Sequence, residues 1–173
     1  MATLERTPWP RRALRHALFG RGEAARAFPP QALETITQAI AAGERTHRGE
    51  VCVIVEKALP LHAIRHGVSD RQRALALFAD YGIWDTDERC GVLIYINLAD
   101  RKVEIVADRG IGRRIDAGAW QAICATMTQG FGKGQFLEAT LAALDAVNAL
   151  LARHFPGDGP RPNELPDRPI VLG

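Results

Sequence analysis

Hydrophobic and polar residues along this chain follow two periods, that of strands and that of helices. Three runs are rich in Val, Ile and Tyr, as strands are, and span residues 51–55, 92–97 and 102–107. Four other stretches carry apolar residues every three or four positions, which is the spacing of one helix face. They begin near residues 30, 69, 117 and 135 and end near residues 43, 81, 129 and 155. The pattern therefore predicts the order helix, strand, helix, strand, strand, helix, helix.

The connections between these elements predict the topology. A short polar turn, Leu98–Arg101, joins the second and third strands, and a turn this short allows only an antiparallel hairpin. A helix separates the first strand from the second, so these two strands should form a right-handed parallel crossover. The expected fold is α/β: a three-layer α/β/α sandwich with a small mixed sheet, built from a parallel βαβ crossover plus an antiparallel hairpin. Residues 58–67, between the first strand and the second helix, are expected to form a loop.

The first 27 residues form a basic extension. They hold six arginines against two glutamates, and Leu14, Ala17 and Leu18 make an apolar stripe with Trp9 near its start. We expect a short helix that packs on the domain and leaves its arginines solvated. Docking on an anionic membrane or on a protein partner is the alternative. The stripe is short and interrupted by prolines and glycine, which argues against the membrane.

The overall composition bounds the rest of the chain. With 173 residues and a net charge of +2, it has the ordinary makeup of one globular domain and no nucleic-acid signature. The domain is expected over residues 28–156, followed by an extended Pro-rich tail over residues 157–173. Three cysteines without a close pair argue against a disulfide scaffold and a cysteine zinc site. No signal or membrane-spanning segment is evident, so we expect a cytoplasmic protein.

Acidic residues gather at one end of the expected sheet. The two parallel strands begin at this end, and the antiparallel third strand finishes there. Six carboxylates precede or follow these strand ends: Glu44, Glu50, Asp85, Asp87, Glu88 and Asp108. Clustered carboxylates suit a hard divalent cation such as Ca²⁺ or Mg²⁺, because they repel one another without one. The alternative is an acidic rim paired with Arg89, Arg109, Arg113 and Arg114.

Other motifs carry less chemistry. His62 and His66 have the spacing of a helical metal pair, but they lack the glutamate of a zinc motif and belong to the opposite end of the sheet. Cys90 would be a reactive thiol only if Arg89 lowered its pKa, and a small residue at the edge of the strand is the favoured interpretation. The sequence offers no convincing nucleophile–base pair, so catalytic residues stay unassigned.

The chain resembles the TPM domain family, which includes thylakoid phosphatase-like proteins associated with photosystem II repair and many bacterial homologues. The resemblance rests on the segment GVLIYINLADRKVEIVADRGIG (Gly91–Gly112), on WDT before it, on the helix containing Trp120, on the helix that follows and on NELPD in the tail. It spans about residues 28–170 and is closest to the short soluble bacterial branch. Such proteins often have Asn-Gly at the hairpin start, where this chain has Cys90-Gly91.

The resemblance implies a function that the residues alone do not. TPM domains are associated with divalent cations, calcium in particular, and some with weak acid phosphatase activity. Asp108 is the residue to which the metal role transfers most directly. The expected function is therefore that of a divalent-cation-binding module with an unknown protein partner, and the alternative is a weak metal-assisted acid phosphatase acting on phosphomonoesters.

Overall fold

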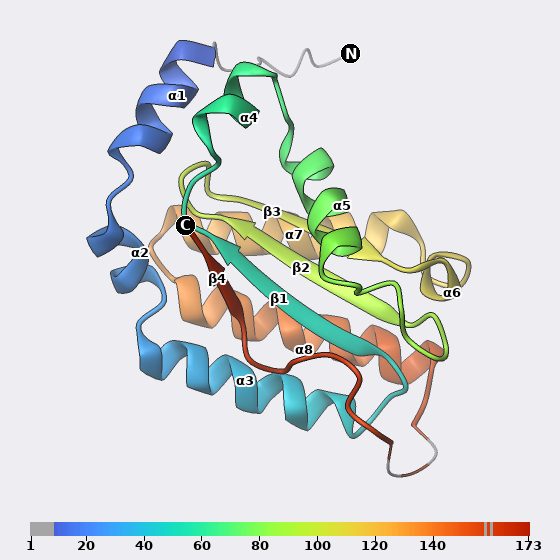
Figure 1. Cartoon of the computed structure of the whole chain (residues 1–173). Coiled ribbons are helices and arrows are strands. Elements are labelled where there is room, and N and C mark those ends of the chain that lie inside the picture. Colours follow the sequence, from blue (N-terminus) through green and yellow to red (C-terminus); the bar gives the residue numbers. More distant parts are fainter. Residues whose placement is uncertain (1–8, 158, 160) are drawn as a thin grey trace.

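A mixed β-sheet lies at the centre of the molecule (Figure 1). The computed structural model describes residues 9–157, 159 and 161–173, and within these residues four strands form the sheet in the order β3-β2-β1-β4. β1 is parallel to β2 and to β4, and β2 is antiparallel to β3. The strands are Glu50–Glu56 (β1), Gly91–Asn97 (β2), Lys102–Ala107 (β3) and Ile170–Leu172 (β4).

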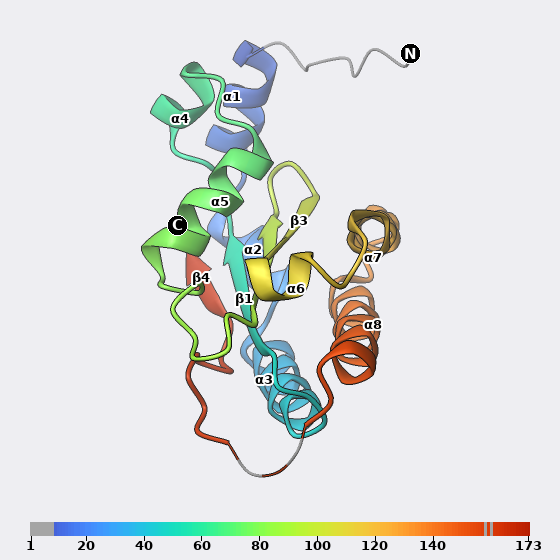
Figure 2. The same ribbon diagram turned by 90° about the vertical axis from the view of Figure 1, so that its right-hand side faces the viewer.

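Helices cover both faces of this sheet, so the expected three-layer α/β/α architecture is confirmed (Figure 2). On one face lie α3, α7 and α8, and on the other lies α5. The long helices are Pro30–Glu44 (α3), Asp70–Asp80 (α5), Ala117–Gly132 (α7) and Phe136–His154 (α8). The shorter ones are Trp9–Leu18 (α1), Arg21–Ala27 (α2), Leu61–Arg65 (α4) and Arg109–Gly112 (α6).

The alternation of side chains along the strands divides the core in two. Val51, Val53 and Val55 of β1 point to the larger core beneath α3, α7 and α8, whereas Cys52 and Ile54 point to the smaller core beneath α5. Because both faces of the sheet are covered, β1 and β2 are buried along their whole length. This explains why these strands are continuous apolar runs in the sequence.

The structure corrects two sequence-based expectations. Residues 58–67 are not only a loop, because Leu61–Arg65 form the short helix α4 after Pro60. The tail was expected to be extended without a strand, but Ile170–Leu172 form β4, which adds a parallel strand to the free edge of β1. None of the helices among the described residues is long and apolar enough to cross a membrane.

The basic N-terminal segment is helical over most of its described part. Helix α2 contributes Ala24 and Ala27 to the larger core, where Phe28 packs edge-on against Phe131 and Phe136. Helix α1 lies beside α4 at the end of the sheet where β1 and β2 finish (Figures 1 and 2). The arginines of α1 are not all solvated, because Arg12 and Arg15 form ion pairs with Asp100 of the hairpin turn.

Candidate functional site

The sequence-predicted acidic residues surround the end of the sheet where β1 and β2 begin. Glu50 is in register with Gly91, and the Asp108 N–H that follows β3 donates to the Gly91 carbonyl over 2.9 Å. The backbone therefore brings the three strand ends together as the topology predicts. The side chains, however, form three separate groups at this end: one around Glu44, one around Glu88 and one around Asp108.

Glu44 and Glu50 form the first group together with the tail. Glu44, the last residue of α3, accepts a 2.8 Å hydrogen bond from the Val51 N–H and lines the same cavity as Asp167 of the tail. The buried Glu50 carboxylate accepts from the N–H groups of Glu164 and Leu165, at 3.4 and 3.3 Å. These contacts anchor the NELPD segment of the tail on the start of β1.

The carboxyl groups of this first group hold protons more tightly than usual. Burial raises the pKa of Glu44 to about 8, and the charges of Glu50 and Asp167 act in the same direction, although the Val51 hydrogen bond opposes it. Burial also raises the pKa of Glu50, helped by the nearby charges of Glu164 and Asp167. Both shifts favour the protonated carboxyl groups, because burial and neighbouring negative charges disfavour ionisation.

Glu88 belongs to a second group, in which it forms ion pairs with two arginines. Its carboxylate lies 2.9 Å from the Arg48 guanidinium and also binds Arg161 of the tail. Asp85 and Asp87 are exposed, and the Asp87 N–H donates to the Glu164 carboxylate over 2.8 Å. The ion pairs of Glu88 with Arg48 and Arg161 are of the kind that the acidic-rim alternative predicts, but the sequence led us to expect other arginines as partners.

Asp108 stands apart as the third group. Its Oδ1 caps the short helix α6 by accepting a 2.6 Å hydrogen bond from the Arg109 N–H. Its Oδ2 is buried and has no hydrogen-bond partner among the described residues, and the whole residue is only 8% exposed. An unsatisfied buried carboxylate oxygen costs free energy and marks a place where a water molecule or a cation would be stabilised.

Backbone carbonyls lie close to the turn that begins at Asp108. A Cβ atom on Gly110 would come within 2.5 Å of the Arg89 carbonyl oxygen and 3.2 Å of that of Glu88. Arg89 holds a left-handed conformation, with φ of 52°, which turns the chain just before β2. Only glycine at position 110 lets the two loops approach so closely. The loops before β2 and after β3 thus bring carbonyl oxygens near the Asp108 turn.

Among the described residues, no group of three or more His, Cys, Asp and Glu side chains is placed to hold a metal ion. A cation at this end of the sheet would therefore take one or two carboxylates, with its other ligands from backbone carbonyls and water. Calcium and magnesium accept such oxygen ligands. The Asp108 turn fits this requirement better than the Glu44 group, whose carboxyl oxygens already accept backbone hydrogen bonds.

The remaining residues that the sequence offered as metal ligands or as a reactive thiol lie away from this end of the sheet or are buried. His62 and His66 lie on α4 and at its C-terminal end, which follow the far end of β1. Burial raises the pKa of the Cys90 thiol, the Glu88 charge adds to this, and Arg48 only partly opposes it. Cys90 is therefore a buried thiol. The expectation that Arg89 might activate it is not met, since the lowering charges are those of Arg48 and Arg114.

His47 is a polar residue whose role the sequence did not reveal. It is buried, and its ring nitrogens lie 3.1 Å from the Gly49 carbonyl and 3.0 Å from the Asn148 side-chain oxygen. Burial lowers its pKa, although both contacts oppose the change. His47 thereby connects the start of β1 to α8. The only sequence signal for this role is its place before the strand.

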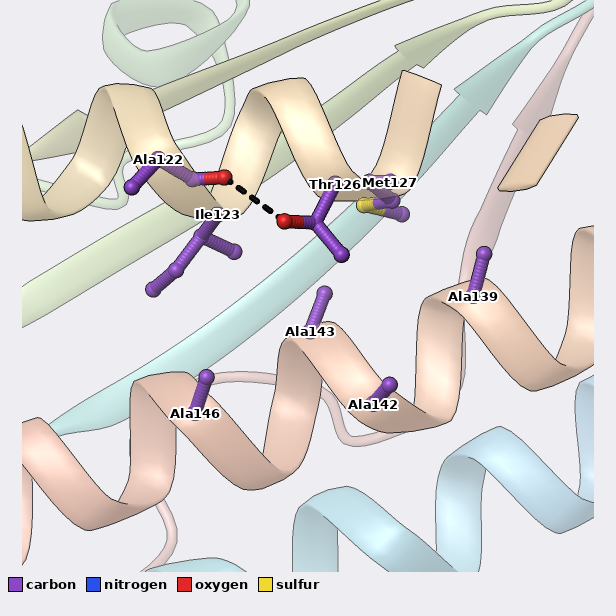
Figure 3. A pocket seen from close by; sticks show the side chains of 8 residues that line it. All are labelled: Ala122, Ile123, Thr126, Met127, Ala139, Ala142, Ala143 and Ala146. Carbon is purple, nitrogen blue, oxygen red and sulfur yellow. Dashed lines mark hydrogen bonds between the residues drawn. The ribbon is translucent and has the colours of Figure 1, made fainter. Parts of the chain in front are cut away.

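Two cavities lie near these elements. The first, of about 490 Å³, is lined by α3, the turn before β1 and the tail, including Glu44, Glu50 and Asp167. The second, of about 180 Å³, lies between α7 and α8, where small side chains such as Ala122, Ala142 and Ala146 face one another (Figure 3). No titratable group lines the second cavity, so it offers no acid–base chemistry.

The mixed sheet between two layers of helices agrees with the fold that the family resemblance implies. The family model of the TPM domain matches residues 23–150. The chain belongs to the TPM domain family. A similar solved structure is the NMR structure of BA42 protein from the psychrophilic bacterium Bizionia argentinensis, with a TM-score of 0.72 and 24% sequence identity. The similarity covers 82% of this chain and 92% of BA42, and it establishes the shared fold. No curated protein matches.

Proposed function

We propose that this TPM domain is a divalent-cation-binding module in which Asp108 binds Ca²⁺ or Mg²⁺. The observation that carries the proposal is the buried Oδ2 of Asp108, which has no hydrogen-bond partner in the part of the chain that the structure describes. A hard cation would satisfy this oxygen, with the neighbouring carbonyls of Glu88 and Arg89 as candidate further ligands.

The surrounding charges favour a cation over an anion at this position. Glu88 and Asp108 both act on the Cys90 thiol in the direction that raises its pKa, so two negative charges lie near the same point. Arg48 partly neutralises Glu88, at a distance of 2.9 Å. A bound divalent cation would compete with this arginine for the Glu88 carboxylate, and Glu88 would then become a second ligand.

A binding or assembly role is favoured over phosphatase chemistry. Metal-assisted hydrolysis needs a positioned nucleophile or an activated water beside the metal. Cys90, the nearby nucleophilic side chain, is buried, and burial raises the pKa of its thiol. We therefore expect no turnover of p-nitrophenyl phosphate with Ca²⁺ or Mg²⁺. Turnover that requires both the metal and Asp108 would assign the phosphatase activity instead.

Calorimetry and thermal unfolding with CaCl₂ or MgCl₂ test the proposal. A cation that binds only the folded state stabilises it, by about 2.7 kcal/mol at a concentration of 100 times Kd. Asp108→Asn is the informative variant, because the amide still accepts the Arg109 N–H and preserves the helix cap while it removes the charge. We expect this variant to fold and to lose the metal response.

Two matched controls locate the site. His62→Ala with His66→Ala should keep the metal response, because both residues lie at the far end of the sheet. Glu44→Gln should also keep it, because Glu44 belongs to the separate tail-anchoring group. If Glu44→Gln removes the response while Asp108→Asn retains it, the cation binds in the cavity near the tail and the proposal is wrong.

A further inference from the structure

Helix α1 packs on the domain with its basic side facing inward. The Arg12 guanidinium donates 2.8 Å hydrogen bonds to the Asp100 carboxylate and to the Val68 carbonyl. His16 is buried, accepts from the Leu59 N–H at Nδ1 over 2.9 Å, and places Nε2 3.0 Å from Asp100. The hairpin turn and the segments around α4 thus bind the polar side of this helix.

The apolar side of α1 is left exposed to solvent. Leu14 is 60% exposed and Leu18 is 71% exposed, one helical turn apart on the outward side, and Trp9 at the start of the helix is 61% exposed. An amphipathic helix on a soluble domain normally buries its apolar stripe and exposes its charges. The sequence led us to expect the stripe to pack on the domain, and the structure shows the reverse.

The exposed charges around this apolar side are mainly basic. Arg11 on α1, Arg65 on α4 and Arg101 of the hairpin turn are exposed. Leu18 and Arg101 line the same surface hollow, of about 540 Å³. The acidic residues Asp70 and Asp100 at this end are already paired with Arg12, which leaves Glu23 of α2 as the exposed carboxylate lining the hollow.

We propose that α1 docks the protein on an anionic membrane surface through its exposed apolar side. Trp9, Leu14 and Leu18 would enter the boundary between lipid headgroups and acyl chains, as the apolar faces of interfacial helices do. Arg11, Arg65 and Arg101 would bind lipid phosphates. A second copy of the chain is a poorer occupant, because a symmetric contact through this surface would bring the same basic residues against one another.

Co-sedimentation of the intact protein with lipid vesicles tests this proposal. The vesicles contain either phosphatidylglycerol mixed with phosphatidylcholine or phosphatidylcholine alone. The test variant carries Trp9→Ser, Leu14→Ser and Leu18→Ser, which replace exposed side chains and should leave the fold intact. Its matched control carries Leu75→Ser and Trp84→Ser, which remove exposed apolar side chains elsewhere on the molecule.

The wild-type protein and the control variant should co-sediment with the anionic vesicles at low salt and should bind them less at physiological salt. Neither protein should co-sediment with the neutral vesicles. The triple variant should bind on the order of a hundredfold more weakly, because the apolar contribution is lost. Vesicles should shift to shorter wavelength the part of the tryptophan fluorescence that a Trp9→Phe variant lacks, because Trp84 and Trp120 remain in both proteins.

Three results would overturn the proposal. The first is wild-type protein that stays in the supernatant with anionic vesicles at low salt. This result counts against the proposal even if a variant that lacks residues 1–8 binds the vesicles. The second is a triple variant that binds as the wild type does, or a wild type that binds neutral vesicles equally well. The third is a lipid-free dimer that the triple variant breaks into monomers, since a second copy would then occupy the surface.

Discussion

The Val51 N–H at the start of β1 donates a 2.8 Å hydrogen bond to the carboxyl group of Glu44, the last residue of helix α3. The charges of Glu50 and of Asp167 in the tail favour a proton on Glu44, because like charges repel one another. The groups that face Glu44 are partly acidic and partly basic, since the surrounding cavity is also lined by Arg45, His47, Arg48, Glu50 and Arg161. The stability of this junction between α3, β1 and the tail therefore depends on pH.

The first prediction is a loss of stability as the pH rises through the neutral range. Burial raises the pKa of Glu44 from 4.5 to about 8, so the folded state holds a proton that the unfolded chain releases. The stability that this proton supplies is complete below about pH 4.5 and is lost as the pH rises through about 8. The urea midpoint, measured from about pH 5 to about pH 9, should fall across this range.

Glu44→Gln is the variant that isolates this effect. The amide can accept from the Val51 N–H, and it carries no charge at any pH. Its urea midpoint should fall less steeply over the same range. If wild type and variant lose stability in parallel, another group is responsible for the pH dependence.

The second prediction concerns Asp100, which binds α1 to the hairpin turn. Burial opposes ionisation, but His16, whose Nε2 lies 3.0 Å from the carboxylate, and the hydrogen-bonded Arg12 guanidinium outweigh it and lower the pKa of Asp100 well below its usual range. The resulting stability is present above the usual pKa of 3.8 and is lost as the pH falls through the lower value. Asp100→Asn should therefore destabilise the protein at neutral pH, by about 2 kcal/mol for charged hydrogen bonds.

The readout for Asp100→Asn should be local as well as global. Trypsin should cleave at the arginines of α1 faster in this variant, because the helix opens more often without its ion pairs. Asp145→Asn, which changes an exposed aspartate on α8, serves as the control. Unchanged cleavage of α1 in Asp100→Asn would show that the apolar contacts of α2 alone hold the segment in place.

The main elements of the fold could be predicted because local pattern determines them. β1 and β2 are continuous apolar runs as a result of burial on both faces, and the Ser69–Gln72 capping box begins α5 as expected. β4 could not be predicted in the same way. It has three residues and follows Pro169, and only its pairing with β1 makes it a strand.

The sequence predicts at which end of the sheet the acidic residues lie, but it does not predict which residues their side chains contact. Topology places Glu50 and Asp108 at the same end, and both lie there. The binding of Glu50 by Glu164 and Leu165, and the contact between Glu88 and Arg161, depend on the course of a proline-rich tail that has no periodic pattern. The orientation of α1 was missed for a similar reason, since its partner Asp100 lies far away in the sequence.

The last prediction concerns a buried charge at the other end of β1. Glu56 is 3% exposed, and its carboxylate accepts hydrogen bonds from the Arg73 guanidinium, at 2.7 to 3.2 Å, and from the Tyr95 hydroxyl, at 2.6 Å. Arg73→Met should cost about 3–5 kcal/mol, because it leaves a buried carboxylate without its counter-charge. Tyr95→Phe should cost only about 1 kcal/mol, since Arg73 still satisfies Glu56.

The control is Arg65→Met, which changes an exposed arginine, and its free energy of unfolding should stay within about 0.5 kcal/mol of the wild type. Equal losses for Arg73→Met and Tyr95→Phe in urea unfolding would show that packing, and not the charge of Glu56, sets the stability of this end of the sheet.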